Sequence, residues 1–184
     1  MRHPDLAQRE KSCLLVVDVQ ERLMPAIHGG ERVVESCVRL IRGVRLLQVP
    51  ILVTTQYVRG LGPLVAPVAE ALGESGAFDK TAFSCCAEDG FFGRLDALEK
   101  DTVIVCGVEA HVCVLQTALD LVENGYRVHV VADAIGSRDP ENRRVALEKM
   151  ARAGAVISTT EMVLFELLRR AGAAEFKAVQ ALVK

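Results

Sequence analysis

The sequence predicts an α/β fold of three layers, in which helices cover both faces of a mostly parallel sheet of about six strands. Short, continuous apolar runs are typical of strands that are buried on both faces, and longer amphipathic segments separate these runs. The 184 residues, of which 51% are hydrophobic, suit a single domain over residues 1–184 with a large buried core. The runs that we assign to strands are 13–17, 51–53, 102–106, 127–132 and 155–157, with a shorter extended piece at 78–80.

Helix signals fall between these apolar runs. Apolar residues recur at helical spacing in 33–47 and in 115–122, and Gly125 is placed to end a helix that begins near His111. The stretch 59–67, with two Gly and two Pro, predicts a loop that overhangs the strand ends. The remaining signals are an N-cap at Asp139 before Pro140, a capping box at 158–161 and a short terminal helix from Gly172 onward.

Charge and composition exclude several classes of partner. With 22 basic and 24 acidic residues, a formal net charge of −2 and no long run of one sign, the chain offers no basic face for nucleic acid. No apolar stretch is long enough to span a membrane, and the first residues lack the apolar core of a signal peptide. The six cysteines form no CxxC pair, so we expect thiols in a reducing cytoplasm.

Polar residues follow the predicted strands at one edge of the sheet. Ligands of open parallel sheets bind beyond the carboxyl ends of the strands, where a carboxylate, an amine and a thiol would meet: Asp18, Lys80 and Cys113. Each of them alone has a plain structural interpretation, as a loop cap, a surface lysine or a small core residue. Together they supply the parts of an acyl-transfer site.

The three groups have complementary chemistry. A thiol needs a base or a lowered pKa before it attacks a carbonyl carbon, and Asp18 is the candidate base. Lys80 is a positive charge that favours both the thiolate and the ionised carboxylate, and we expect Phe78 and Phe83 to shield it partly. Cys113 falls in the first turn of a predicted helix, where the helix dipole favours the thiolate and backbone N–H groups can face an oxyanion.

Three segments resemble the isochorismatase-like cysteine hydrolases in order and spacing. This superfamily includes nicotinamidases and other small amidases, and the resemblance implies an isochorismatase-like (Rossmann-like) fold over about residues 12–168. The segments are LLVVDVQ at 14–20, FDKTAFS at 78–84 and VIVCGVEAHVCVLQTALDL at 103–121.

The resemblance implies a role for each matching residue. Asp18 matches the general base of the family, Lys80 its lysine and Cys113 its nucleophile. The family's cis peptide bond would join Val108 to Glu109, and the backbone N–H groups of Glu109 and Cys113 would form the oxyanion hole. The implied reaction is hydrolysis of a small amide or related carbonyl compound through a thioester intermediate.

Two departures from the family pattern narrow this prediction. Nicotinamidases carry an Asp-x-His metal pattern after the second strand, where this chain reads Gln56-Tyr57-Val58. We therefore predict no metal and no cofactor, and we do not expect nicotinamide as the substrate. Isochorismatases themselves typically lack the cysteine, so its presence favours acyl chemistry. The predicted substrate contacts are Gln20, Gln56, Tyr57 and Phe83.

Other polar residues near these motifs have structural interpretations. His111 lies two residues before Cys113 and should face elsewhere, toward a subunit interface for example. Only the backbone of Glu109 is expected to act, and Asp133 should fix the loop that follows its strand. Cys106 is predicted to be a core residue, and the pair at 85–86 to be structural.

One alternative function stays open at this point. A chain with this fold can be a non-catalytic or vestigial binding or scaffold protein, although the complete set of three reactive groups favours a hydrolase. A dinucleotide-dependent oxidoreductase is disfavoured, because the turn at 18–22 has no glycine for the approach of a pyrophosphate. We expect a small-molecule substrate and a homo-oligomer.

Overall fold

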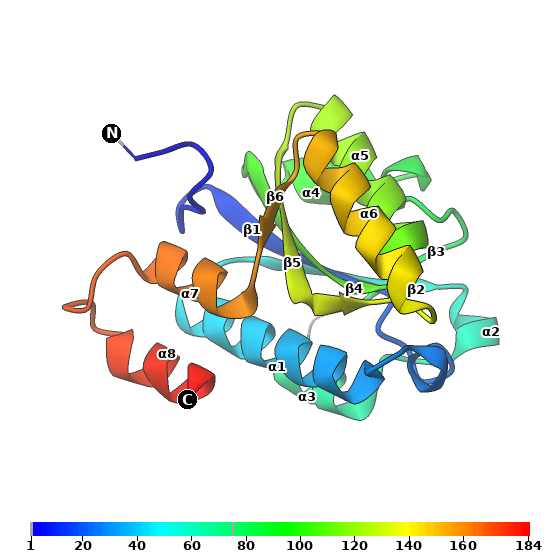
Figure 1. Cartoon of the computed structure of the whole chain (residues 1–184), viewed down its shortest axis with the longest axis horizontal. Coiled ribbons are helices and arrows are strands. Elements are labelled where there is room, and N and C mark those ends of the chain that lie inside the picture. The colour runs from blue at the N-terminus through cyan, green and yellow to red at the C-terminus, as the bar shows by residue number, and fades with distance from the viewer. Residues whose placement is uncertain (1, 75) are drawn as a thin grey trace.

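The computed structural model describes residues 2–74 and 76–184, and it shows three layers with a sheet at the centre (Figure 1). The six strands pair in the order β3-β2-β1-β4-β5-β6, and every pair is parallel. The predicted fold class is therefore confirmed. The strands are β1 (Ser12–Val17), β2 (Ile51–Gln56), β3 (Phe78–Lys80), β4 (Thr102–Val108), β5 (Arg127–Gly136) and β6 (Val156–Ser158).

The strand order creates a crevice at one point of the sheet edge. The chain begins at the centre with β1, winds outward through β2 and β3, and then returns to β4 on the other side of β1. The connections on the two sides leave the sheet in opposite directions, so the loops after β1 and β4 separate at their carboxyl ends. Val17 of β1 pairs with Gly107 of β4 at this point, which places the segments that follow both strands beside the crevice.

Helices cover both faces of the sheet (Figure 1). The side chains of β1 alternate between the two resulting cores: Leu14 and Val16 belong to one core, and Leu15 and Val17 belong to the other. This double burial explains the continuous apolar run. One face carries α1 (Gly30–Leu46), α3 (Ala66–Leu72), α7 (Thr160–Leu168) and α8 (Phe176–Val183), and the other carries α4 (Phe91–Asp96), α5 (Leu115–Glu123) and α6 (Pro140–Arg152).

The predicted N-cap of α6 is confirmed, whereas the capping box before α7 is displaced by one residue. The Asp139 side chain accepts a hydrogen bond from the Glu141 backbone N–H, with proline at the first helical position. The residue that caps α7 is Thr159, whose hydroxyl accepts from the Met162 N–H. Ser158 is the last residue of β6 and does not cap the helix.

Two further sequence predictions were wrong. The stretch 59–67 is not a continuous loop, because α2 (Val58–Leu61) occupies its beginning and α3 starts at its end. Asp133 does not end its strand, since β5 continues to Gly136. Its carboxylate accepts the backbone N–H of Thr160 at 2.7 Å, so Asp133 anchors the start of α7 and not the loop after β5.

Within the described part of the chain, no helix combines the length and the apolar character that crossing a membrane requires.

Candidate active site

A buried ion pair lies at the crevice between β1 and β4. The Lys80 Nζ atom is 2.7 Å from the Asp18 Oδ2 atom, and both side chains are 0% exposed. Asp18 directly follows β1 with a left-handed backbone (φ 53°), a conformation that is uncommon outside glycine and recurs at functional sites. Two of the three predicted reactive groups are therefore in direct contact.

Lys80 makes more hydrogen bonds than a surface lysine would. Besides Asp18, its ammonium donates to the Gln56 Oε1 atom at 2.6 Å and to the backbone carbonyls of Ala82 and Phe83, each at 3.2 Å. Burial, the largest single influence, lowers the pKa of Lys80, but Asp18 together with the smaller effects of Cys113 and Cys85 outweighs it, so that pKa is raised above its usual range. Phe83 is 55% exposed, and its backbone carbonyl is the group that accepts a hydrogen bond from Lys80.

Cys113 lies on the segment that joins β4 to α5. This segment is a π-helical turn (Ala110–Val114), so the thiol sits just before α5 and not in its first turn. π-Helical turns are rare and occur often at functional sites. Cys113 is 7% exposed, and the electrostatic influence of Asp18 and Lys80 on its thiol places it beside the ion pair.

The resting thiol differs from the sequence expectation. Burial and the negative charge of Asp18 raise the pKa of Cys113 to about 12, and the opposing effect of Lys80 is smaller. A hydrogen bond between the thiol and Asp18 acts in the same direction as burial. The thiol is therefore protonated at neutral pH, and the predicted thiolate stabilisation by Lys80 and the helix dipole does not prevail.

The end of β4 approaches β1 closely enough to require glycine. A Cβ atom on Gly107 would lie 2.0 Å from the Val17 carbonyl oxygen, and its φ of +115° is rarely adopted by other residues. The next peptide bond, between Val108 and Glu109, is cis, at the position that the family resemblance indicates. The Glu109 carboxylate accepts from the backbone N–H and Nε of Arg138, so its side chain is engaged away from Cys113.

The four predicted substrate contacts fall into two groups. Gln20 is wholly buried, and its amide bonds the backbone of Gln56 and Gly62. The Gln56 amide bonds Lys80 and the Thr81 carbonyl. Both amides are thus used within the protein. The side chains of Tyr57 and Phe83, by contrast, are 54% and 55% exposed, and their backbones flank Lys80.

Sequence reasoning missed two residues that support this site. The Thr54 hydroxyl donates to the Asp18 Oδ1 atom at 2.7 Å, and the Ser137 hydroxyl lies 3.0 Å from the His111 Nδ1 atom. Thr54 is the third-last residue of β2, so its position near the carboxyl end of a central strand was the available signal. Nothing in the sequence signals Ser137. The His111 ring contacts Ser137, which agrees with the prediction that His111 does not pair with Cys113.

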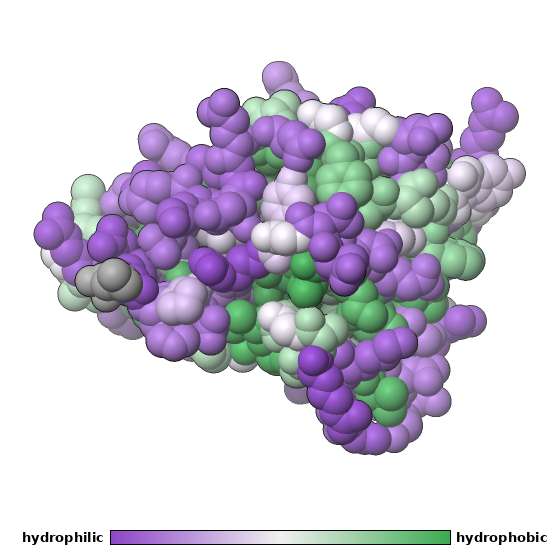
Figure 2. Space-filling view, turned by 90° about the horizontal axis from the view of Figure 1, so that it is seen from above, coloured by the Kyte–Doolittle hydropathy of each residue, from purple (hydrophilic) through white to green (hydrophobic). Residues whose placement is uncertain are grey.

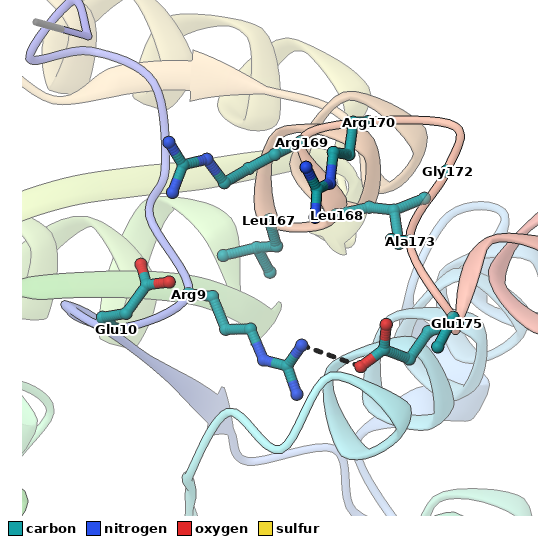
Figure 3. Close-up of a pocket in the computed structure, with 10 residues that line it drawn as sticks. Arg9, Glu10, Leu167, Leu168, Arg169, Arg170, Gly172, Ala173 and Glu175 are labelled. Carbon is teal, nitrogen blue, oxygen red and sulfur yellow. Dashed lines mark hydrogen bonds and ion pairs between the residues drawn. The ribbon is translucent and has the colours of Figure 1, made fainter.

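A cavity of about 620 Å³ lies elsewhere, between the N-terminal segment and the turn that follows α7. Figure 3 shows Arg9, paired with Glu175, on one side of it and Arg169 and Arg170 on the other. None of the candidate catalytic residues lines this cavity. In the described ranges, no cluster of three or more His, Cys, Asp or Glu side chains is arranged to hold a metal ion.

Comparison with known proteins identifies the family. Residues 12–162 match the isochorismatase domain. Isochorismatase domain-containing protein 2A of Mus musculus is 38% identical over 95% of this chain and 84% of its own length. The solved structure of MAR1 ribonuclease from Caenorhabditis elegans is 39% identical, with a TM-score of 0.91 and coverage of 96% of this chain and 91% of that one.

A second solved structure superposes equally well at lower identity. YcaC from Pseudomonas aeruginosa, determined with hexane-2,5-diol and covalent acrylamide, is 25% identical, with a TM-score of 0.91 and coverage of 99% of this chain and 93% of that one. The matched region spans all six strands, and it contains Asp18, Lys80 and Cys113. The chain therefore belongs to the isochorismatase-domain family and has its hydrolase-like fold.

Proposed function

We propose that this protein is a cysteine-dependent hydrolase of a small amide or related carbonyl compound, with a thioester intermediate and an Asp18-Lys80-Cys113 triad. The observation that carries the proposal is the wholly buried Lys80–Asp18 pair beside the Cys113 thiol. A buried ion pair costs desolvation free energy and is weak evidence for stability by itself. Its place at the crevice where ligands of such sheets bind favours a chemical role.

The first half of the reaction makes a thioester. Asp18 takes the proton of the Cys113 thiol while the Sγ atom attacks the substrate carbonyl carbon, and the negative charge moves to the carbonyl oxygen. The backbone N–H groups of Glu109 and Cys113 stabilise that oxyanion. Asp18 then donates the proton to the leaving nitrogen, the C–N bond breaks, and the amine or ammonia leaves.

The second half of the reaction restores the thiol. Asp18 removes a proton from a water molecule as its oxygen attacks the thioester carbonyl carbon. The C–S bond breaks, the carboxylic acid leaves, and the proton returns to Sγ. Lys80 stays protonated throughout, since Asp18 raises its pKa, and it keeps the carboxylate oriented and ionised between steps. The raised pKa of Cys113 fits a thiol that loses its proton only during attack.

Trapping of the acyl-enzyme tests this proposal. We would screen small primary amides and activated esters, quench with acid and measure the intact mass. The proposal predicts an adduct that maps to Cys113, is absent in Cys113→Ala and forms at least tenfold more slowly in Asp18→Asn. Adducts spread over several cysteines, with no dependence on Asp18, would remove its basis.

Two alternatives make different predictions in the same assays. A non-catalytic binding protein is favoured by the protonated state of the resting thiol. Such a protein would bind its ligand equally well in the wild type and in the Cys113→Ala variant, and neither would form an acyl adduct. A ribonuclease, suggested by the relative from Caenorhabditis elegans, would degrade RNA. We infer that RNA is not the substrate, because the net charge is −2 and phosphate contacts need a basic surface. Degradation of RNA by the purified protein, with none in a mock preparation, would contradict this.

We also propose a homo-oligomer in the cytoplasm, with no metal, cofactor, membrane or nucleic-acid partner. Figure 2 shows hydrophobic side chains gathered among hydrophilic ones on the face seen from above. The segment around α5 contributes half-buried apolar residues that pack against the core, and apolar surface patches often mark interfaces. All six cysteines are free thiols, as in a reducing compartment. Light scattering that gives the mass of one chain would contradict the oligomer. The half-buried apolar residues around α5 are Val112, Leu115, Leu119 and Val122.

A further inference from the structure

Asp18 is held from two sides, and only one of them is part of the triad. Lys80 binds its Oδ2 atom, and the Thr54 hydroxyl donates to its Oδ1 atom at 2.7 Å. Thr54 is 1% exposed, so no solvent competes for this hydrogen bond. The backbone strengthens the contact, because the Asp18 N–H donates to the Thr54 carbonyl at 3.3 Å.

A third residue determines the direction in which the Thr54 hydroxyl points. A hydroxyl has one proton to donate and lone pairs to accept with. The wholly buried Cys85 has its Sγ atom 3.9 Å from the Thr54 Oγ1 atom and donates to it. Burial raises the pKa of Cys85 to about 11, so this thiol remains a donor at neutral pH. With its lone pair engaged by Cys85, the hydroxyl directs its own proton to Asp18.

We propose that Thr54 is a positioning residue for Asp18, and that Cys85 fixes the Thr54 hydroxyl in the donor orientation. The inference rests on the proposed role of Asp18 as the base for Cys113. A carboxylate that is fixed at both oxygens cannot rotate away from the thiol. Thr54 therefore holds the base in an orientation that Lys80, which binds only one oxygen, would not fix alone.

The neighbouring residue offers a matched control. Thr55 is also buried, and its hydroxyl donates to the Asp79 Oδ1 atom at 3.0 Å. Successive side chains of a strand point to opposite faces, so Thr55 faces away from Asp18. Thr54→Val and Thr55→Val remove the same atom from adjacent positions, and valine keeps the shape of each side chain. Only Thr54→Val removes a hydrogen bond to the Asp18 carboxylate.

The experiment measures the rate at which acrylamide labels Cys113 from pH 4 to 9, by intact mass and peptide mapping. Thr54→Val should slow labelling about tenfold over this range, because the base is no longer held toward the thiol. Thr54→Ser should restore the wild-type rate, Cys85→Ala should give a smaller decrease, and Thr55→Val should match wild type. If Thr54→Val does not fold, Thr54→Ala and Cys85→Ala provide the same comparison.

The outcomes separate this inference from the function on which it rests. A Thr54→Val labelling rate identical to that of wild type, or a decrease that Thr55→Val reproduces, overturns the positioning role while the triad stands. A rate in Asp18→Asn equal to that of wild type at every pH overturns both. A slower rate in Thr54→Val that Thr54→Ser does not rescue assigns the effect to packing and also overturns the inference.

Discussion

Replacement of Lys80 by methionine removes one half of a buried ion pair and should destabilise the fold strongly. The Nζ–Oδ2 distance is 2.7 Å and neither side chain is exposed, so Lys80→Met leaves the Asp18 carboxylate without a compensating charge in the interior. Its remaining side-chain donors are the Thr54 hydroxyl and the Cys113 thiol. Loss of one partner of a buried pair costs about 3–5 kcal/mol. For a chain of this size, each kcal/mol lowers Tm by roughly 2–4 °C, so we expect a decrease of roughly 6–20 °C.

The assay is urea unfolding followed by far-UV circular dichroism, with a double-mutant cycle. Asp18→Asn should cost less than Lys80→Met, because the Lys80 ammonium keeps three other acceptors. The double variant Lys80→Met, Asp18→Asn should be more stable than Lys80→Met alone, since no buried charge remains. A cost below about 1 kcal/mol for Lys80→Met, or strict additivity in the cycle, would refute the reasoning.

Three further changes test the fold around the site. Burial and the nearby Arg127 lower the pKa of the wholly buried His129 from 6.5 to about 4, so the unfolded chain binds the proton first and stability should fall by up to about 3 kcal/mol between pH 6.5 and 4. His129→Leu should flatten this dependence in denaturant melts at the two pH values; an unchanged slope would contradict it. Gly107→Ala should cost more than about 3 kcal/mol or prevent folding, because its Cβ would lie 2.0 Å from Val17. Thr159→Ala should lower the stability by about 1 kcal/mol through loss of the α7 cap, and a Tm within error of wild type would contradict that role.

The predicted strands were reliable because burial on both faces leaves a simple signal. Every residue of β1 and β4 is buried, so each strand reads as an unbroken apolar run. The short helices α3 and α4 gave no such signal, since each has only a few buried residues and begins or ends at glycine or proline. The extension of β5 past Asp133 was missed because a carboxylate is a common strand terminator, and here it anchors α7 instead.

The candidate site was predictable by residue type but not by environment. Asp18, Lys80 and Cys113 follow from motif and topology, because parallel strands bring their carboxyl ends to one edge. The sequence does not reveal how many acceptors surround a side chain. Gln20 and Gln56 therefore looked free for substrate although both amides are used within the protein.

The protonation state of Cys113 illustrates the same limit. A cation and a helix start both favour a thiolate, and this set the sequence expectation. Burial and the Asp18 charge act in the opposite direction and prevail, raising the pKa of Cys113 to about 12. Such balances depend on distances and solvent access, which a sequence does not contain. For this reason the proposed mechanism has Asp18 remove the proton during attack.

The central claim is that Cys113 attacks a carbonyl carbon with Asp18 as its base, and acid-quenched mass spectrometry tests it most directly. Wild type, Cys113→Ala and Asp18→Asn would each be incubated with the same panel of small amides and activated esters. The account predicts an acyl adduct on Cys113 in wild type that turns over, none in Cys113→Ala, and slow formation in Asp18→Asn. Turnover that persists in Cys113→Ala, or acylation of Cys113 at equal rates with and without the Asp18 carboxylate, would contradict it.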